Sequence, residues 1–471
     1  MSSSSQPWRG RRLHFVGVGG AGMSAYARAA SALGAEVSGS DAHSSPYIER
    51  LAADGVLEAR IGHAPANVPA GAEVEVVYSS AVPAENPERT AARERGLAER
   101  SRAEIVSELS ALRQTIAVAG SHGKTTTASM IVHALRAAEL DPSWLVGGPV
   151  GGGLANAHWS GGEWLVVEAD ESDLSMLSLH VEVAVLMNVE LDHHATFASL
   201  AELREAFRAF LARASGAIVL PDIAELLELA PSAKDADGRG SLPARRGAGR
   251  GSDPSRPTLV LYEHPRATLD PQGSRFSWRG AEVRLRVPGE HNALNAAAAL
   301  EAARLAGAEE ERTIAGLSAF TGAGRRFQLL GRTRAGALLY DDYAHHPSEV
   351  AATLRAARTL SPRRLVAVFQ PHLYSRTAVL ARDFGRALAE ADVMIVLEVY
   401  PARERSEDHP GVSGLLIAEA SADVAAGRPV YWLPAPAAAQ RVLAGMLEEG
   451  DLCLLMGAGD IDSLGRSLVG A

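Results

Sequence analysis

The stretch Thr115–Thr127, TIAVAGSHGKTTT, contains residues whose types and spacing point to phosphate chemistry. Its glycine turn would direct backbone N–H groups at a helix N-terminus, where hydrogen bonds and the helix dipole both favour phosphate oxygens. Lys124 would add a positive charge for the β- and γ-phosphates, and the Thr125 hydroxyl could bind Mg²⁺. The predicted phosphate-binding residues are Gly120, Ser121, His122, Gly123, Lys124, Thr125 and Thr126.

Hydrophobicity predicts the elements that hold this turn. Ile116–Ala119 is an apolar run of strand length, and Thr125–Ala138 has the pattern of a helix. The turn is shorter than the strict nucleoside-triphosphate loop, because Val118 stands six residues before Lys124, where that motif has glycine. A purely structural glycine turn is the alternative to phosphate binding.

A second glycine turn lies near the N-terminus. The apolar run Leu13–Val18 enters the sequence GVGGAG, which contains Gly17, Gly19, Gly20 and Gly22, and a helix is predicted from Met23 to Leu33. The next strand ends in Ser40 and Asp41, at the distance where dinucleotide folds place a ribose-binding acid. This pattern permits NAD, but it does not identify the nucleotide, and a structural turn stays open.

Acidic side chains follow the predicted strand Trp164–Val167. Glu168, Asp170, Glu171 and Asp173 fall within six residues, so they would repel one another unless a cation is present. A solvated acidic loop is the alternative. The next predicted strand, Val181–Asn188, leads to three candidates for metal binding or catalysis. These are Glu190, Asp192 and His193. We expect Glu168 and His193 to end adjacent strands and to share one Mg²⁺, with Glu171 as the reserve ligand.

The rest of the chain adds an insertion and a further α/β region. Lys234–Pro257 consists mostly of Gly, Pro, Ser and Arg and is predicted to be flexible. Asn292 and Asn295 share one face of the helix that follows, either as caps or as contacts to a base or ribose. Strands alternate with helices from Leu338 onward.

Composition narrows the class of protein. With 471 residues, 47% hydrophobic and 22% charged, the chain has the size of about three soluble domains. The net charge of −10 argues against nucleic acid and anionic membranes as partners. The single cysteine, Cys453, lies in an apolar run and is expected to be an inert buried thiol. No signal peptide or membrane span is indicated, so we expect a cytoplasmic protein.

Eleven motifs in order make the sequence similar to the Mur ligase family. They are GVGGAGM, GSDA, SSAV, AGSHGKTTT, EADESD, NVELDHH, PGEHNALNAAAAL, FTGAGRRF, DDYAHHPSEV, FQPHLYSRT and LEVYPARE. The resemblance implies a three-domain α/β protein with an N-terminal Rossmann-like domain, a central P-loop ATPase-like mononucleotide-binding domain and a C-terminal Rossmann-like domain. We place them at residues 1–112, 113–322 and 323–471.

The resemblance also implies an activity. It implies ATP- and Mg²⁺-dependent ligation of L-alanine to the lactyl carboxylate of UDP-N-acetylmuramate through an acyl phosphate, by a monomer or weak homodimer. Alternatives are a related ligase that adds a preformed tripeptide, an NAD-dependent dehydrogenase, and a non-catalytic nucleotide-binding switch.

Residue roles carry over by position. The UDP-sugar site would comprise Gly17, Gly19, Gly20, Gly22, Ser40, Asp41, Ser79 and Ser80. Further ATP contacts would be His291, Asn292, Asn295, Arg325 and Asp341. The metal ligands would be Thr125, Glu168 and His193. The residues near the amino acid would be Tyr343, His345, His372 and Arg376. The catalytic set would be Lys124, Glu168, His193, His345 and Arg376.

Three positions depart from the family pattern. Leu373 stands where members commonly have an arginine, so Arg376 would carry more of the charge that faces the alanine carboxylate. Ala195 and Phe197 replace an acid and a tyrosine often found after His193, and the insertion has no assigned counterpart. None of these departures removes a group that the chemistry requires.

Overall fold

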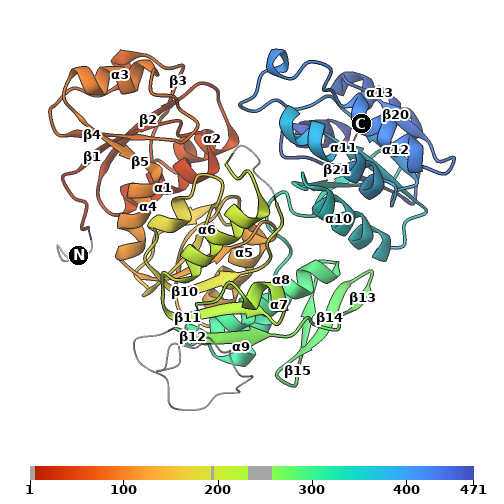
Figure 1. The fold of residues 1–471 in the computed structure, drawn as a ribbon, viewed down its shortest axis with the longest axis horizontal. Coiled ribbons are helices and arrows are strands. Elements are labelled where there is room, and N and C mark those ends of the chain that lie inside the picture. The colour runs from red at the N-terminus through yellow and green to blue at the C-terminus, as the bar shows by residue number, and fades with distance from the viewer. Residues whose placement is uncertain (1–5, 192–195, 232–256, 471) are drawn as a thin grey trace. The chain divides into compact units, whose positions relative to one another are not determined.

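The computed structural model describes residues 6–191, 196–231 and 257–470 (Figure 1). The chain divides into two compact units. The first unit comprises Met1–His264 and Asn295–Gly316, and the second comprises Pro265–Leu294 and Leu317–Ala471. The predicted insertion lies outside the described residues except for Pro257, and His193 also lies outside them.

The first unit contains two sheets. The N-terminal sheet has five parallel strands in the order β3-β2-β1-β4-β5. Its strands are β1 (Arg12–Val16), β2 (Glu36–Asp41), β3 (Arg60–Ile61), β4 (Val74–Tyr78) and β5 (Ala98–Ser101). The helical elements between and after them are α1 (Ala21–Ala32), α2 (Pro46–Ala53), η2 (Pro65–Asn67), α3 (Pro87–Glu94) and α4 (Arg102–Ala111). The strand order and crossovers are those of a Rossmann-like sheet, as predicted.

The central sheet has seven strands in the order β12-β11-β10-β6-β9-β7-β8, parallel except for the pair β7 and β8. Its strands are β6 (Gln114–Ala119), β7 (Ser143–Leu145), β8 (Ala157–His158), β9 (Trp164–Glu168), β10 (Val181–Leu186), β11 (Ala214–Pro221) and β12 (Thr258–Tyr262). Its helical elements are α5 (Lys124–Ala137), η3 (Ser175–Ser178), α6 (Leu200–Leu211) and α7 (Ala224–Leu227).

The strand order corrects one prediction. We expected the strands that lead to Glu168 and His193 to be adjacent, but β6 lies between β9 and β10. The phosphate-loop strand is therefore flanked on both sides by strands that end in acidic segments.

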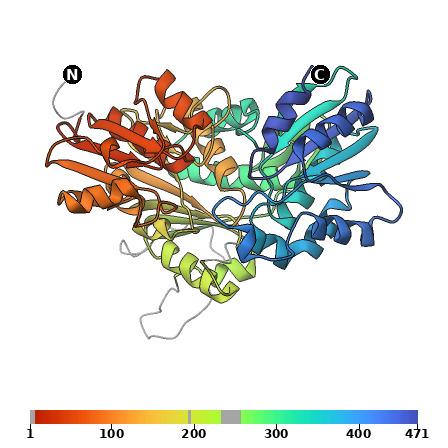
Figure 2. The same ribbon diagram turned by 90° about the horizontal axis from the view of Figure 1, so that it is seen from above.

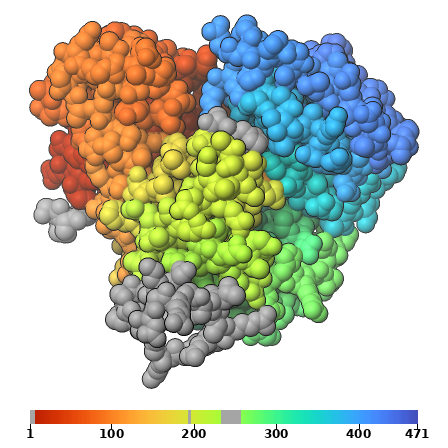
Figure 3. Space-filling view, viewed as in Figure 1, coloured from red at the N-terminus to blue at the C-terminus, as the bar shows by residue number. Residues whose placement is uncertain are grey.

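One hydrophobic core joins the two sheets of the first unit. The same buried cluster contains Phe15 and Ile105 from the N-terminal sheet and its helices, and Ala117 and Leu165 from the central sheet. Figure 3 shows the surfaces of these two regions, orange and yellow, in direct contact. The two sheets of this unit are therefore packed against a common set of buried side chains.

The second unit contains a three-stranded antiparallel sheet and a six-stranded sheet (Figure 2). The small sheet consists of β13 (Thr268–Asp270), β14 (Gly273–Trp278) and β15 (Ala281–Leu285). The larger sheet has the order β16-β17-β21-β18-β19-β20, with only β16 antiparallel to its neighbour. The chain passes between the units after His264, within α8 (Glu290–Leu305) and within α9 (Glu310–Ala319).

The larger sheet is covered by helices and has buried clusters on both faces. Its strands are β16 (Gln328–Arg332), β17 (Leu338–Asp342), β18 (Arg364–Phe369), β19 (Val393–Val396), β20 (Val430–Trp432) and β21 (Asp451–Met456). Its helical elements are α10 (Pro347–Thr359), α11 (Tyr374–Leu388), η4 (Ser406–Asp408), α12 (Leu415–Val424), α13 (Pro436–Met446) and α14 (Ile461–Leu468). Cys453 is a free, buried thiol on β21, and burial raises its pKa to about 12, as expected for an inert side chain.

Candidate functional site

The phosphate loop connects β6 to α5 and needs glycine at both of its ends. Gly120 has φ +135° and Gly123 has φ +83°, which residues with a side chain rarely adopt. A Cβ atom on Gly123 would lie 2.6 Å from the Asn295 side-chain oxygen. The loop backbone and the predicted nucleotide contact Asn295 are therefore packed together.

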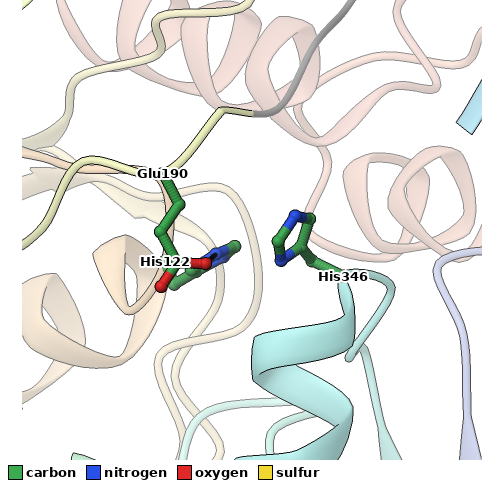
Figure 4. Close-up of side chains that lie close together, drawn as sticks. All are labelled: His122, Glu190 and His346. Carbon is green, nitrogen blue, oxygen red and sulfur yellow. Dashed lines mark hydrogen bonds and ion pairs between the residues drawn. The ribbon is translucent and has the colours of Figure 1, made fainter. Parts of the chain in front are cut away.

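The segment after β10 holds the loop from the side. The Ser121 hydroxyl donates to the Glu190 carbonyl over 2.7 Å, and the Glu190 N–H donates back to that hydroxyl. Asn188 exchanges two hydrogen bonds with the His122 backbone, of 2.9 and 3.0 Å. The side chains of His122 and Glu190 lie 3.2 Å apart (Figure 4). Asn188 was not predicted as part of the site, although it is the last residue of the predicted strand Val181–Asn188.

Lys124 folds back over the loop. Its ammonium group donates to the Gly120 carbonyl (2.6 Å), the Ser121 carbonyl (3.3 Å) and the Glu171 carboxylate (2.9 Å). Burial alone would lower the pKa of Lys124, but the carboxylates of Glu171, Asp170 and Glu168 outweigh it and raise the pKa. The lysine is therefore a fixed positive charge at the loop.

The Thr125 hydroxyl points at the acid that ends β9. It lies 3.0 and 3.1 Å from the two Glu168 carboxylate oxygens, and the Gly147 N–H donates to the same carboxylate over 2.6 Å. Thr125 and Thr126 are both buried in the first turn of α5. Two predicted metal ligands from separate elements thus meet, and both offer the hard oxygen atoms that suit Mg²⁺.

The acidic loop after β9 is partly neutralised. Arg102 lies 3.3 Å from Asp170 and 3.2 Å from Asp173, while Lys124 pairs with Glu171. Burial would raise the pKa of Asp170, but Arg102, Lys124 and hydrogen bonds from Ser172 hold it at about 2. Among these described groups, two positive charges face four carboxylates. Two negative charges are left over, and Glu168 forms an ion pair with neither Arg102 nor Lys124. This surplus suits a divalent cation.

Most of the residues predicted for the UDP-sugar site lie together at the first glycine turn. The Gly19 N–H donates to the Asp41 carboxylate over 2.8 Å, and a Cβ atom on Gly17 would lie 3.1 Å from Ser79. Gly17 has φ +83°. Gly20 precedes α1 and Gly22 lies in its first turn, while Ser80 is exposed after β4. These groups occupy the carboxyl ends of β1, β2 and β4, where open α/β sheets bind ligands.

Ser40 differs from its neighbour Asp41. We expected both beside the ligand, but Ser40 is fully buried and its hydroxyl donates to Glu88 over 2.7 Å. His14, His63 and Asn67 also contact the Glu88 carboxylate, at 2.8, 3.0 and 2.9 Å. The Ser40 side chain therefore faces Glu88, while the Ser40 backbone carbonyl accepts the Gly17 and Val18 N–H groups of the turn over 2.9 and 3.0 Å. Its contact with the ligand stays a prediction.

In the second unit, side chains after β17 and β18 form one cluster. Arg376 is buried and lies 3.1 Å from a ring nitrogen of His372. The rings of His345 and His372 are 6.0 Å apart, and those of Tyr343 and His345 are 5.5 Å apart. The structure thus brings together the four residues predicted near the amino acid. Leu373 is buried beside them with φ +70°.

The other predicted nucleotide contacts of the second unit are held by their own surroundings. Arg325 donates to Asp341 over 3.0 Å and to the carbonyls of Gly457 and Gly459 over 2.8 Å each. The Asn292 side chain donates to the Pro288 carbonyl over 2.7 Å. Burial lowers the pKa of His291 to about 4, and nearby Arg355 acts in the same direction. His291 is therefore neutral at pH 7.

Family models match along most of the chain. The Mur ligase family catalytic domain matches residues 12–114, the Mur ligase middle domain matches residues 118–303, and the Mur ligase glutamate ligase domain matches residues 325–459. The chain belongs to the Mur ligase family. The predicted family and the predicted three-part α/β fold class are confirmed, whereas the domain boundaries and residue roles stay predictions.

Relatives of this Mur ligase are similar over their full length. A UDP-N-acetylmuramate–L-alanine ligase of Kineococcus radiotolerans is 45% identical, over 97% of this chain and 95% of that protein. The ligase of the same name from Saccharopolyspora erythraea is 44% identical, over 97% of this chain and 92% of that protein. The structure of the UDP-N-acetylmuramate–alanine ligase of Thermotoga maritima has a TM-score of 0.79 and 25% identity, covering 97% of this chain and 98% of that one.

Family membership makes this Mur ligase an enzyme that uses ATP and small-molecule substrates. In the described part of the chain, every helix is too short or too polar to span a membrane.

Proposed function

We propose that the chain joins L-alanine to the lactyl carboxylate of UDP-N-acetylmuramate, with conversion of ATP to ADP and phosphate, in peptidoglycan precursor synthesis. The observation that carries the proposal is the full-length similarity, at 45 and 44% identity, to ligases named for this reaction. The enzyme would act in the cytoplasm, where ATP is available, as a monomer or weak homodimer.

The named relatives also favour alanine over a preformed tripeptide. A murein peptide ligase of Psychrobacter arcticus has a TM-score of 0.69 at 24% identity, which supports a common fold and nothing finer. An NAD-dependent dehydrogenase would leave Lys124, Glu168 and His193 without roles. A non-catalytic nucleotide-binding switch would use Lys124 and Thr125 to bind ATP, but it would not turn ATP over.

The phosphate loop supports the first half-reaction. A carboxylate acylates poorly, so an oxygen of the lactyl carboxylate would attack the γ-phosphorus of ATP, with ADP as the leaving group. The loop N–H groups would bind the phosphates, and the Lys124 ammonium would exchange its contact with Glu171 for phosphate oxygens. That exchange keeps the lysine charge paired both before and after ATP binds.

Thr125 and Glu168 are the described residues that would hold Mg²⁺, with His193 as a further ligand predicted from the sequence. Their oxygen atoms and the surplus negative charge of the acidic loop fit a hard divalent cation. When bound, Mg²⁺ would reduce the repulsion between the phosphates and the attacking carboxylate.

The first glycine turn would bind the UDP-sugar. Backbone N–H groups at the start of α1 would face the diphosphate, and Asp41 would lie at the adjacent strand end. Because Asp41 already accepts the Gly19 N–H, it would orient the turn and not contact phosphate itself.

The cluster of the second unit would bind alanine and support the second half-reaction. Buried Arg376 would pair with the alanine carboxylate. His345 places Nδ1 3.0 Å from the Tyr343 carbonyl and 3.2 Å from the Glu349 carboxylate, so Nδ1 carries a proton. Nε2 in its unprotonated form would take a proton from the alanine ammonium. The amine would then attack the acyl carbon, and phosphate would leave.

Product release tests the proposal. Purified protein with Mg²⁺, ATP and UDP-N-acetylmuramate should release phosphate at a rate that depends on added L-alanine, with weaker rates for glycine and serine. The product should gain the mass of one alanyl group. Preferred use of the tripeptide, or no phosphate release with any amino acid, would overturn the assignment.

A further inference from the structure

Arg102 lies on helix α4, which follows the last strand of the N-terminal sheet, but it pairs with the acidic loop after β9 of the central sheet. It is the first residue of α4, which begins with a capping box formed by Ser101 and Glu104. Its guanidinium lies 3.3 Å from Asp170, 3.2 Å from Asp173 and 3.4 Å from the Ser175 hydroxyl. One cation therefore holds two carboxylates of the loop that follows β9.

The same guanidinium lies beside the first glycine turn. A Cβ atom on Gly22 would be 3.9 Å from the Arg102 guanidinium carbon, and that carbon lies 6.0 Å from the centre of the Tyr26 ring on α1. Asn156 of the central region donates to the Ala21 carbonyl over 2.7 Å at the start of the same helix. The start of α1 and the acidic loop thus share Arg102 as a common neighbour.

The acidic loop connects Arg102 to the phosphate loop. Asp170 lies one residue from Glu171, which pairs with Lys124, and two residues from Glu168, which accepts the Thr125 hydroxyl. Without Arg102, Asp170 and Asp173 would repel each other and these two acids. The loop backbone that places Glu168 and Glu171 therefore depends on the Arg102 side chain, which comes from helix α4 beside the N-terminal sheet.

We propose that Arg102 is a positioning residue that couples the UDP-sugar turn to the ATP and Mg²⁺ site. A diphosphate at the start of α1 would draw the guanidinium toward Gly22, and this movement would be passed through Asp170 and Asp173 to the loop that places Glu168 and Glu171. Coupling of this kind is reciprocal, so ATP should in turn strengthen binding of the UDP-sugar. The inference rests on the proposed function.

The planar fork of arginine suits this position better than lysine does. Arginine presents several N–H groups in fixed directions, so it can hold two carboxylates at once, whereas a lysine ammonium is a point charge on a flexible stem. Arg102→Lys should therefore keep part of the coupling, and Arg102→Gln should remove it.

The test measures UDP-N-acetylmuramate affinity by calorimetry, with and without a non-hydrolysable ATP analogue and Mg²⁺. In the unaltered enzyme the analogue should tighten binding by about fivefold or more. Arg102→Gln should reduce that factor to near one, and Arg102→Lys should give an intermediate factor. Absence of coupling in the unaltered enzyme would overturn the proposal.

Two further variants separate coupling from folding. Arg100→Gln is the matched control, because Arg100 on β5 pairs with three carboxylates that do not belong to the acidic loop, Glu75 on β4 and Glu104 and Glu108 on α4. It should keep full coupling. Arg102→Gln combined with Asp170→Asn restores the net charge of the loop and leaves only Asp173 without its cation, so its melting temperature should recover in part while coupling stays lost. Recovery of coupling in the double variant, or its loss in Arg100→Gln, would contradict the proposal.

The proposed function can fail independently. If the unaltered enzyme makes no alanyl product, the assigned reaction is wrong. If it makes the product and Arg102→Gln retains full coupling, only the role of Arg102 is wrong.

Discussion

The two glycine turns of the first unit share a local design and differ in the charged side chain beside them. Each connects a buried strand to a helix N-terminus and contains a glycine with positive φ. In the first turn a carboxylate, Asp41, accepts a turn N–H over 2.8 Å. In the second turn an ammonium group, Lys124, lies over two loop carbonyls.

This difference separates two ways of using the same motif. A carboxylate beside the turn accepts one of the turn N–H groups and adds negative charge. The first turn therefore suits a ligand that is bound and oriented but whose phosphates do not react there. A lysine adds the positive charge that is needed where phosphate oxygens gain charge in a transition state. The glycine pattern alone does not distinguish these cases, but the neighbouring side chain does.

The largest effect is expected at the residue that sets the second turn apart. Lys124→Ala should lower kcat by at least about 10³-fold, because no other described side chain supplies a cation at the loop carbonyls. The measurement is phosphate release together with ATP binding. The variant should still fold, with a lower melting temperature because buried Glu171 loses its cation. Near-normal turnover by the folded variant would remove the basis of the comparison.

A smaller effect is expected in the second unit, which should serve the third substrate. Arg376→Ala removes a buried guanidinium, and truncation of a desolvated arginine–carboxylate pair costs roughly 2–5 kcal/mol. The KM for alanine should therefore rise well over tenfold, while the KM for UDP-N-acetylmuramate should not move. An increase confined to the KM for ATP or the sugar would mean that the cluster does not bind the amino acid.

The next test is a matched pair that places the same change in each turn. A Cβ atom on Gly19 would lie 2.9 Å from an Asp41 oxygen, and one on Gly123 would lie 2.6 Å from an Asn295 oxygen. Gly123→Ala should raise the KM for ATP by about 5- to 30-fold, because a side chain at positive φ costs about 1–2 kcal/mol. Gly19→Ala should raise the KM for the UDP-sugar instead. Equal effects of both variants on one substrate would refute the division of roles.

The sequence predicted those parts of the structure that are determined by residues close to one another in the chain. Both turns follow from an apolar run and glycines. Lys124 comes directly after its turn, and Asp41 ends the strand that follows the first turn and its helix. Strand order was not predictable in this way, since nothing within β9 or β10 shows that β6 lies between them. The edge strand β16, QLLGR, was missed because it is short, contains glycine and is mostly exposed.

Contacts between distant residues were also missed. Arg102 and Asp170 are 68 positions apart, and a capping box around Arg102 predicts a helix start without naming the carboxylate that the arginine meets. Ser40 is a different case. Successive side chains of a strand point to opposite faces, so the side chains of Ser40 and Asp41 meet different surroundings. That alternation was present in the sequence.

The smallest kinetic effect is expected at Glu88, behind the first turn, where the readout is stability against pH. Burial would raise the pKa of Glu88, but hydrogen bonds from His14, Ser40, Asn67 and His63 hold it at about 2, below the usual 4.5. A carboxyl group whose pKa is lowered by folding stabilises the protein above its unfolded pKa. This stabilisation should be complete above about pH 4.5 and should fall as the pH drops toward 2. At neutral pH it amounts to about 3 kcal/mol, from about 1.4 kcal/mol per pKa unit.

Glu88→Gln should therefore be less stable than the unaltered enzyme at pH 7, and the gap in unfolding free energy should narrow as the pH falls from about 4.5 to 3. Urea unfolding at several pH values measures this gap. Glu36→Gln, on the exposed start of β2, is the control and should leave the pH profile unchanged. At pH 7 the KM for ATP should stay the same in both variants, because Glu88 contacts only the N-terminal sheet and its connections among the described residues. A gap that stays constant down to pH 3 would show that the carboxylate charge is not what holds the end of β2 behind the first turn.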